Sequence, residues 1–582
     1  MTSNRYTTSL LHKLEFIYGK NKAKTLLQDI DRLVDSYADA NRKSNNRWVS
    51  EQDVMLITYG DSIQSSGESP LQTLRKFVQR YCDGLFSAVH ILPFYPYTSD
   101  DGFSVTDYRE VNPKLGDWTD IADLAAHVDL MFDGVINHIS QHSHWFQQYL
   151  AGNPEYADYF VEADPAEDYS QVTRPRALPL LTKFDTALGE KHIWTTFSDD
   201  QIDLNYASER VLLEILDILL MYVVRGARYL RLDAIGFMWK KLGTTCMHLD
   251  ETHAIVQVIR EVLENFAPGT IIITETNVPH KDNIKYFGNG SNEAHMVYQF
   301  PLPPLTLHTL HTGNSDKLME WLQSLEPTTD STAFFNFLAS HDGVGVRPVE
   351  GILSKQEVNA MVDKVHEHGG FVSYKDNGDG TRSPYELNIN YLEALSHPDD
   401  SIEMKVKRFR AASAILLSVM GMPAIYIHSL LGSRNDTEGV KKTGRYRSIN
   451  REQLRYEQVE SELQQEGSLR NEVYSSIAQL IKLRIGEPCF HPNAAQRVVV
   501  CDNRLFTIIR TSAEGGQVLA LVNVADESVS VPCSQLQTGW KEGEAAVDLV
   551  GGETFKWSDS LQLCVQPYQV MWIKQLKGGD DT

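Results

Sequence analysis

The sequence predicts an α/β protein built on a (β/α)8 TIM barrel, and three features indicate this fold. Short runs rich in apolar and β-branched residues recur, each followed by a loop and a helical pattern. There are eight such runs, the number of strands in this barrel. Polar clusters follow four of the runs, and the carboxyl ends of the strands form the face on which such a barrel carries its site.

The eight predicted strands are unevenly spaced. They span residues 54–59, 88–94, 130–137, 229–233, 270–275, 296–300, 333–340 and 424–427. A stretch rich in Pro, Asp and Tyr separates the third from the fourth strand and predicts a small inserted B-type domain at 142–208. Clusters of Gly, Asn, Asp and Pro after the seventh strand, among them 368–370 and 377–380, predict a loop-rich insertion over the acceptor site at 343–398. The catalytic barrel then comprises residues 51–141 and 209–486.

The two ends of the chain differ from the barrel pattern. Residues 1–50 form a leader with a predicted helix at 26–40. Beyond residue 486 the pattern changes to short alternating strands at 504–510, 517–523, 527–532 and 565–573. Residues 487–582 are therefore predicted to form a separate antiparallel β domain.

Composition excludes several classes of function. A formal charge of −23 repels nucleic acid and anionic lipid, so neither nucleic acid nor a membrane is expected as a partner. No apolar run approaches the roughly 20 residues of a membrane helix, and no secretory signal is visible, so we expect a cytoplasmic protein. The six cysteines include no C-x-x-C pair and predict neither a metal cluster nor a disulfide framework. Nothing in the sequence indicates an oligomeric state.

The polar clusters at four strand ends carry the candidate chemistry. They are Asp133-Gly-Val-Ile-Asn137-His138 after the third strand, Arg231-Leu-Asp233 after the fourth, Glu275 after the fifth and His341-Asp342 after the seventh. A single cluster can simply cap a helix or hold a loop. Four clusters in order, each at a strand end, predict an active site.

Two of these carboxyl groups suit the cleavage of a glycoside with retention of configuration. That reaction needs an acid and a nucleophile about 5–5.5 Å apart, and the fourth and fifth strands of a barrel are neighbours. Asp233 is the expected nucleophile, kept ionised by Arg231 on the same strand face. Glu275 is the expected general acid/base, because the apolar run at 271–273 favours a raised pKa.

Together these motifs resemble glycoside hydrolase family 13, the α-amylase superfamily, over nearly the whole chain. The resemblance implies Asp233 as nucleophile, Glu275 as acid/base and Asp342 as a stabiliser of the transition state. It also implies that His138 and His341 bind sugar hydroxyls. For Asn137, bracing of its loop and binding of calcium are equally open, and no metal is predicted.

The chain is similar in more detail to the sucrose phosphorylase subfamily. The similarity lies in Pro93-Phe-Tyr-Pro96, Asp100-Asp-Gly-Phe103, Arg174-Pro-Arg176, Ser340-His-Asp-Gly343 and Gly444-Arg-Tyr-Arg-Ser-Ile-Asn-Arg451. It implies that Asp100 and Arg447 clamp a single glucosyl unit between Phe103 and Phe197, with Arg176 facing phosphate. Inorganic phosphate is then a co-substrate, and no other cofactor is expected. The alternative for Arg176 is a solvated basic turn.

The acceptor region departs from typical sucrose phosphorylases. It contains Arg347-Pro-Val-Glu-Gly351 and Ser383-Pro-Tyr-Glu-Leu-Asn388, with Glu386 where those enzymes generally have Gln. These features, with the longer leader, resemble glucosylglycerol and glucosylglycerate phosphorylases. Arg347, Tyr385 and Glu386 are the predicted acceptor residues.

We therefore predict a retaining disaccharide phosphorylase that transfers glucose from a small α-glucoside to phosphate and releases α-glucose 1-phosphate. Glucosylglycerol is favoured narrowly over glucosylglycerate, because an anionic Glu386 would repel glycerate and bind glycerol hydroxyls; pairing of Glu386 with Arg347 is the alternative. Sucrose or sucrose 6'-phosphate as the substrate, an α-glucosidase or transglucosylase, and a catalytically inactive binding subunit remain open.

Overall fold

A closed barrel of eight parallel strands forms the core of the protein in the computed structural model, which describes residues 8–40, 47–176, 178–376 and 380–576. The strands are β1 (Met55–Thr58), β3 (Ala88–Ile91), β4 (Asp129–Gly134), β9 (Ala227–Leu232), β10 (Ile271–Thr274), β11 (Met296–Tyr298), β12 (Ala333–Asn336) and β16 (Met422–Tyr426). Each overlaps one of the eight predicted strands, and β16 closes the barrel against β1. The predicted barrel is confirmed.

Helices surround the barrel because its strands are buried on both faces. In chain order, the helices outside the leader and the two insertions are α3 (Pro70–Phe77), α4 (Trp118–Ala125), α6 (Glu209–Val224), α7 (Asp250–Phe266), α8 (His280–Asn283), α9 (Leu302–Thr312), α10 (Asp316–Gln323), α13 (Ile402–Ser418), α14 (Ile427–Leu430), α15 (Thr437–Thr443), α16 (Tyr456–Gln464) and α17 (Leu469–Ile485). Within the described residues, no helix combines the length and the apolar character needed to cross a membrane.

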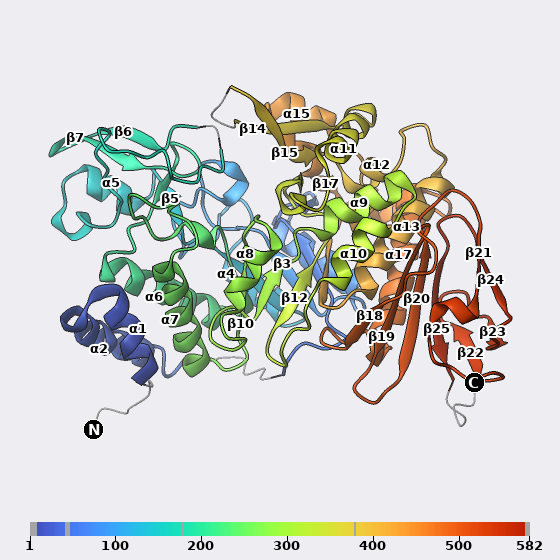
Figure 1. The fold of residues 1–582 in the computed structure, drawn as a ribbon. Coiled ribbons are helices and arrows are strands. Elements are labelled where there is room, and N and C mark those ends of the chain that lie inside the picture. Colours follow the sequence, from blue (N-terminus) through green and yellow to red (C-terminus); the bar gives the residue numbers. More distant parts are fainter. Residues whose placement is uncertain (1–7, 41–46, 177, 377–379, 577–582) are drawn as a thin grey trace.

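The leader differs from its prediction. It forms two helices, α1 (Thr8–Tyr18) and α2 (Lys20–Ser36), so the predicted helix at 26–40 begins too late and ends too late. Both helices lie beside α6 and α7 on the outside of the barrel (Figure 1). Leu10 and Leu14 of α1 are fully buried there, and Lys13 pairs with Glu261 at 2.6 Å. The leader is thus part of the helical layer.

The segment after the third barrel strand extends above the barrel. It contains α5 (His144–Leu150), the hairpin β6 (Leu181–Thr186) and β7 (Gly189–Trp194), and β8 (Gln201–Asp203). β8 returns to pair with β5 (His138–Ser140), directly after β4. This return anchors the inserted segment at the edge of the site.

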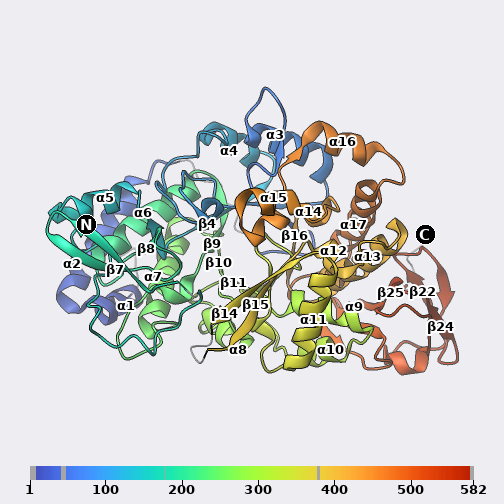
Figure 2. The ribbon, with the colours of Figure 1, turned by 90° about the horizontal axis from the view of Figure 1, so that it is seen from above.

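The segment after the seventh strand is more regular than its predicted loop-rich form. It holds α11 (Lys355–Glu367), α12 (Tyr391–Leu395) and a three-stranded sheet of β13 (Val344–Gly345), β15 (Arg382–Asn388) and β14 (Phe371–Asp376). Figure 2 shows this sheet lying over the barrel. Residues 377–379 of the predicted turn cluster at 377–380 fall outside the described part of the chain.

The C-terminal segment forms an antiparallel β structure, as predicted. Its larger sheet has the order β18 (Ala495–Val498), β19 (Leu505–Thr511), β20 (Gln517–Asn523), β25 (Val570–Gln575), β22 (Ala545–Asp548), β23 (Thr554–Lys556); β21 (Val529–Pro532) pairs with β24 (Gln562–Val565). One sheet face has its own apolar core, which includes Leu519, Trp557 and Ile573. The other packs against the barrel through Phe506 and Trp572. The exact domain boundaries stay predictions.

Candidate active site

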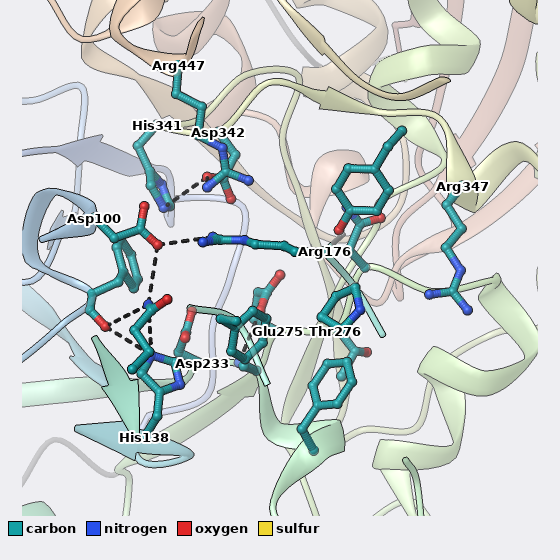
Figure 3. A pocket seen from close by; sticks show the side chains of 18 of the residues that line it. Asp100, His138, Arg176, Asp233, Glu275, Thr276, His341, Asp342, Arg347 and Arg447 are labelled. Atoms are coloured by element: carbon teal, nitrogen blue, oxygen red, sulfur yellow. Dashed lines mark hydrogen bonds and ion pairs between the residues drawn. The ribbon is translucent and has the colours of Figure 1, made fainter. Parts of the chain in front are cut away.

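One cavity at the carboxyl ends of the barrel strands collects nearly all the predicted site residues (Figure 3). Those lining it are Asp100, Phe103, His138, Arg176, Phe197, Arg231, Asp233, Glu275, His341, Asp342, Arg347, Tyr385 and Arg447. Glu386 lines neighbouring cavities instead. Residues from several strand ends, the inserted segment and the loop after β12 thus meet at one place.

Arg231 organises the centre of the site. Its Nη1 donates to Asp233 Oδ1 at 2.8 Å and also bonds Asp133, its register partner on the neighbouring strand β4. Its Nη2 lies 3.8 Å from Glu275 Oε2. Asp133 is itself held by His90 at 2.6 Å. One buried guanidinium therefore contacts both carboxyl groups predicted to perform the chemistry.

The backbone after the nucleophile candidate also contacts the acid. Ala234 has a φ of 51°, a conformation that non-glycine residues adopt rarely and that is frequent at functional sites. Its N–H donates to Glu275 Oε2 at 3.2 Å. This turn keeps Asp233 and Glu275 on adjacent strands facing the same cavity.

Burial controls the protonation of this pair. It raises the pKa of Glu275, as predicted, and it raises the pKa of Asp233 to about 8, because desolvation and the nearby carboxylates outweigh the attraction of Arg231. The expectation that Arg231 keeps Asp233 ionised left out this desolvation, which opposes the charge on Asp233. The two carboxyl groups act as a coupled pair that holds one proton near neutral pH, and the hydrogen bond from Arg231 favours its location on Glu275.

Asp342 carries a stable negative charge. Arg447 Nη1 lies 2.6 Å from Asp342 Oδ1, and His341 Nε2 lies 3.6 Å from it. Although burial opposes ionisation, Arg447, His341 and Arg451 hold the pKa of Asp342 well below its usual range. A fixed carboxylate in the cavity can stabilise a developing oxocarbenium charge.

Aromatic and imidazole rings line the part of the cavity assigned to the sugar. The rings of Phe103 and His341 are stacked with their centroids 4.9 Å apart. The ring centroids of Phe197 and His138 are 5.2 Å apart. Burial lowers the pKa of His341 to about 3 and that of His138 to about 4, so both rings are neutral. Neutral imidazoles can donate to or accept from sugar hydroxyls.

The loop after β3 is tightly folded around Asp100. Asp100 and Asp101 both have positive φ angles, 54° and 49°. A Cβ at Gly102 would lie 2.6 Å from the Pro93 carbonyl oxygen, so only glycine fits there. The turn aims Asp100 at the cavity, where it accepts a hydrogen bond from Arg176 at 3.0 Å. Arg176 thus lies in the site and is not a solvated basic turn.

The acceptor residues are arranged differently from the prediction. Glu386 is 4% exposed, accepts from the Gly343 N–H at 2.6 Å and from Arg447 Nε at 3.2 Å, and does not pair with Arg347. Arg347 reaches the cavity from the side opposite Asp100 (Figure 3). Within the described residues its guanidinium forms no ion pair and no hydrogen bond. Burial raises the pKa of Tyr385 to about 12, which leaves its hydroxyl protonated.

A lysine lies among the oxygens around Asn137. Lys240 Nζ is 2.5 Å from Asp203 Oδ2 and 3.3 Å from Asn137 Oδ1, and it also bonds the Phe237 carbonyl. In the part of the chain that the structure describes, no group of three or more His, Cys, Asp or Glu side chains is arranged to hold a metal ion. Asn137 bonds both Lys240 and Asp203, and these contacts connect its loop to the inserted segment.

The cavity also includes residues that sequence reasoning missed. Gln201 of β8 lies 3.2 Å from His138 Nε2 and 3.3 Å from Asp100, and Asn277 follows the catalytic candidate Glu275 by two positions. The position of Asn277 at a strand end was a usable signal. Gln201 lies in the inserted segment, where no strand end marks it.

Several known proteins are similar to this chain in sequence. Residues 80–366 match the model of the α-amylase catalytic domain. Three glucosylglycerate phosphorylases, from Escherichia coli, Allomeiothermus silvanus and Spirochaeta thermophila, are 43–46% identical; the E. coli enzyme matches over 96% of this chain and 99% of its own length at 46%. A glucosylglycerol phosphorylase from Marinobacter adhaerens is 30% identical over 75% of this chain and 88% of its own.

A solved structure has the same fold. The sucrose 6F-phosphate phosphorylase of Thermoanaerobacter thermosaccharolyticum superposes with a TM-score of 0.73 at 25% identity, covering 88% of this chain and 99% of that one. Most of the fold therefore recurs in a protein named for phosphorolysis.

Proposed function

Because the chain belongs to the α-amylase family and, within it, to the retaining glycoside phosphorylases, we propose that it cleaves glucosylglycerate with phosphate to give α-glucose 1-phosphate and glycerate. The family membership rests on relatives that match nearly the full length of the chain. The choice of glycerate as the leaving group rests on the charge of the acceptor side of the cavity.

The proposed reaction has two displacements. Glu275 donates a proton to the glycosidic oxygen while Asp233 attacks the anomeric carbon, which releases glycerate and leaves a β-glucosyl ester. Phosphate then attacks the ester with Glu275 as base, and Asp233 leaves. Two inversions give net retention. Asp342 stabilises the positive charge that develops at the sugar in both steps.

Arg347 is the single observation that carries the choice of glycerate. It lines the catalytic cavity, and no carboxylate within the described residues neutralises it. An unpaired guanidinium favours a carboxylate, which it can bind with two parallel hydrogen bonds. Glycerate carries a carboxylate that Arg347 can bind, whereas glycerol carries none.

The argument that favoured glucosylglycerol does not apply. It required Glu386 to present a free negative charge to the acceptor, but Glu386 is paired with Arg447 and capped by the Gly343 N–H. Glu386 therefore faces Arg447, which it shares with Asp342, and it lines neighbouring cavities rather than this one. We accordingly replace glucosylglycerol with glucosylglycerate as the favoured substrate.

The test is the release of glucose 1-phosphate from glucosylglycerate, glucosylglycerol, sucrose and sucrose 6'-phosphate, each with and without phosphate. We expect phosphate-dependent release with the highest kcat/KM on glucosylglycerate. Free glucose at equal rates without phosphate would indicate a hydrolase, and a preference for glucosylglycerol would refute the proposed substrate.

The variant Arg347→Ala tests the charge argument directly. A hydrogen bond to a charged group contributes about 1.5–3 kcal/mol, so we expect kcat/KM for glucosylglycerate to fall about 10- to 100-fold. The change for uncharged glucosylglycerol should be much smaller. Equal losses on both substrates would show that Arg347 does not recognise the carboxylate.

A further inference from the structure

Asn277 is a second polar group without a partner on the acceptor side of the cavity. It lines the cavity two residues after Glu275, at the carboxyl end of β10. Its Oδ1 is buried without a hydrogen-bond partner, and its Nδ2 donates no hydrogen bond to any of the described residues. The neighbouring Thr276 differs, because its hydroxyl is satisfied by Asn283 at 2.9 Å. A buried acceptor without a partner is costly, so Asn277 is suited to receive a donor from a ligand.

The position of Asn277 is fixed by the loop that carries Arg347. A Cβ on Gly345 would lie 2.8 Å from Asn277 Nδ2 and 3.1 Å from its Oδ1, so the amide packs on the bare backbone of Gly345. Gly345 lies two residues before Arg347 and pairs with Glu386 in the sheet over the barrel. The Asn277 amide and the Arg347 guanidinium therefore reach the cavity from segments that pack against each other.

The proposed leaving group has three polar substituents around one carbon. C2 of glycerate bears the glycosidic oxygen, the carboxylate and a CH2OH group. Under the proposed function, Glu275 serves the glycosidic oxygen and Arg347 the carboxylate. The hydroxyl on C3 then remains, and Asn277 lines the same cavity as the residues that serve the other two substituents.

We infer that Asn277 is a specificity-determining residue whose amide binds the 3-hydroxyl of the glycerate leaving group. The inference rests on the proposed function and adds a residue to it. The amide can present its oxygen or its nitrogen to the hydroxyl, because a half-turn about Cβ–Cγ exchanges the two atoms. Contacts to three different substituents of C2 also distinguish the two enantiomers of glycerate, so the enzyme discriminates between them.

The test removes each partner of this contact in turn. In the synthetic direction, glucose 1-phosphate is the donor, and phosphate release is measured with glycerate or with lactate of the same configuration. Lactate is glycerate without the 3-hydroxyl and keeps the carboxylate for Arg347. We expect wild-type enzyme to favour glycerate over lactate in kcat/KM by about tenfold or more, since an amide left unpaired penalises the deoxy acceptor.

The variant Asn277→Ala should abolish this preference, with kcat/KM for glycerate falling to about that for lactate. Asn503→Ala, at an exposed asparagine of the C-terminal β structure, is the matched control and should keep the wild-type ratio. Slow hydrolysis of glucose 1-phosphate without acceptor and the Tm report whether the variant remains folded. If Asn277→Ala does not fold, Asn277→Asp replaces it, because aspartate has the size of asparagine and keeps an oxygen that accepts hydrogen bonds. Both acids should then bind more weakly, because the aspartate repels their carboxylates. The preference for glycerate over lactate should persist.

The outcomes separate the inference from the proposed function. If glycerate is no acceptor for wild-type enzyme, the proposed function is wrong. If glycerate is an acceptor but Asn277→Ala retains the preference over lactate, the inference alone is overturned. Equal losses on both acids in Asn277→Ala would also overturn it, because the amide would then serve the carboxylate.

Discussion

Arg176 donates a hydrogen bond to Asp100 across 3.0 Å and thereby joins the inserted segment to the loop after β3. Burial opposes the charge on Asp100, but Arg176, Arg447 and Arg451 hold its pKa well below the usual range. The same guanidinium of Arg176 lies 5.6 Å from the centroid of Phe197. The residue assigned to phosphate thus bonds one residue assigned to the sugar and lies over the ring of another, so the two halves of the reaction share one charged wall.

The variant Arg176→Ala should weaken the use of phosphate more than the binding of the glucoside. Without this cation, phosphate loses a charge-assisted partner, and we expect its KM to rise about tenfold or more. A larger share of the glucosyl ester should then react with water. Free glucose and glucose 1-phosphate are measured together over a range of phosphate concentrations.

Arg174→Ala is the control, because Arg174 lies on the same turn but is exposed and does not line the cavity. The control should keep the wild-type ratio of glucose 1-phosphate to free glucose. An unchanged phosphate KM in Arg176→Ala would remove Arg176 from the phosphate site.

The variant Glu275→Gln tests the proposed general acid through the leaving group. Acid catalysis typically contributes 10²- to 10⁴-fold, so the rate on glucosylglycerate should fall by about that factor. α-Glucosyl fluoride needs little help from an acid to leave, and its first step should be affected far less. Asp233→Asn should abolish the reaction of both substrates, because neither can form the ester without the nucleophile. Equal losses in Glu275→Gln on both substrates would contradict the acid role.

The pH dependence should follow the coupled pair of Asp233 and Glu275. The first step needs one proton on the pair, on Glu275, with Asp233 ionised. Because burial raises the pKa of both carboxyl groups, the pair keeps this proton above the usual range of carboxyl groups; activity should fall at higher pH as the last proton leaves and at low pH as a second proton binds. We expect a bell-shaped profile of kcat/KM. In Glu275→Gln, measured with α-glucosyl fluoride, the alkaline limb should disappear; its persistence would assign that limb to another group.

The site residues at the strand ends were predictable from the sequence, because a barrel brings the carboxyl ends of all its strands to one face. A polar residue directly after an apolar run, as at Asp233 and Glu275, reaches the same face whatever the surrounding loops do. The resemblance to phosphorylases then extended the assignment to Asp100 and Arg447, which also line the cavity.

Pairing between distant loops was not predictable in the same way. Glu386 and Arg447 are 61 positions apart, and nothing in either motif indicates that they pair instead of Glu386 and Arg347. That single difference reverses the electrostatic argument about the acceptor. The raised pKa of Asp233 was likewise missed, because it depends on burial among several carboxylates as well as on its nearest cation.

The last prediction concerns the stability provided by Lys240. Its side chain is 6% exposed, and its ammonium lies 2.5 Å from the fully buried Asp203, whose other contacts include the Thr196 N–H at 2.7 Å. Lys240→Ala would leave the Asp203 carboxylate buried beside Asn137 without a cation. Loss of one partner of a buried pair typically costs about 3–5 kcal/mol. We therefore expect Lys240→Ala to lower the Tm by several degrees, as measured by calorimetry.

Lys241→Ala is the matched control, because Lys241 is 60% exposed and only 3.6 Å from Glu251, an arrangement worth about 0–1 kcal/mol. Its Tm should stay near that of the wild-type enzyme. Since β8 carries Asp203 and lies at the edge of the site, Lys240→Ala should also raise the KM for glucosylglycerate. Equal Tm values for the two variants would show that other contacts hold the loop around Asp203 and that the ion pair with Lys240 does not stabilise the protein.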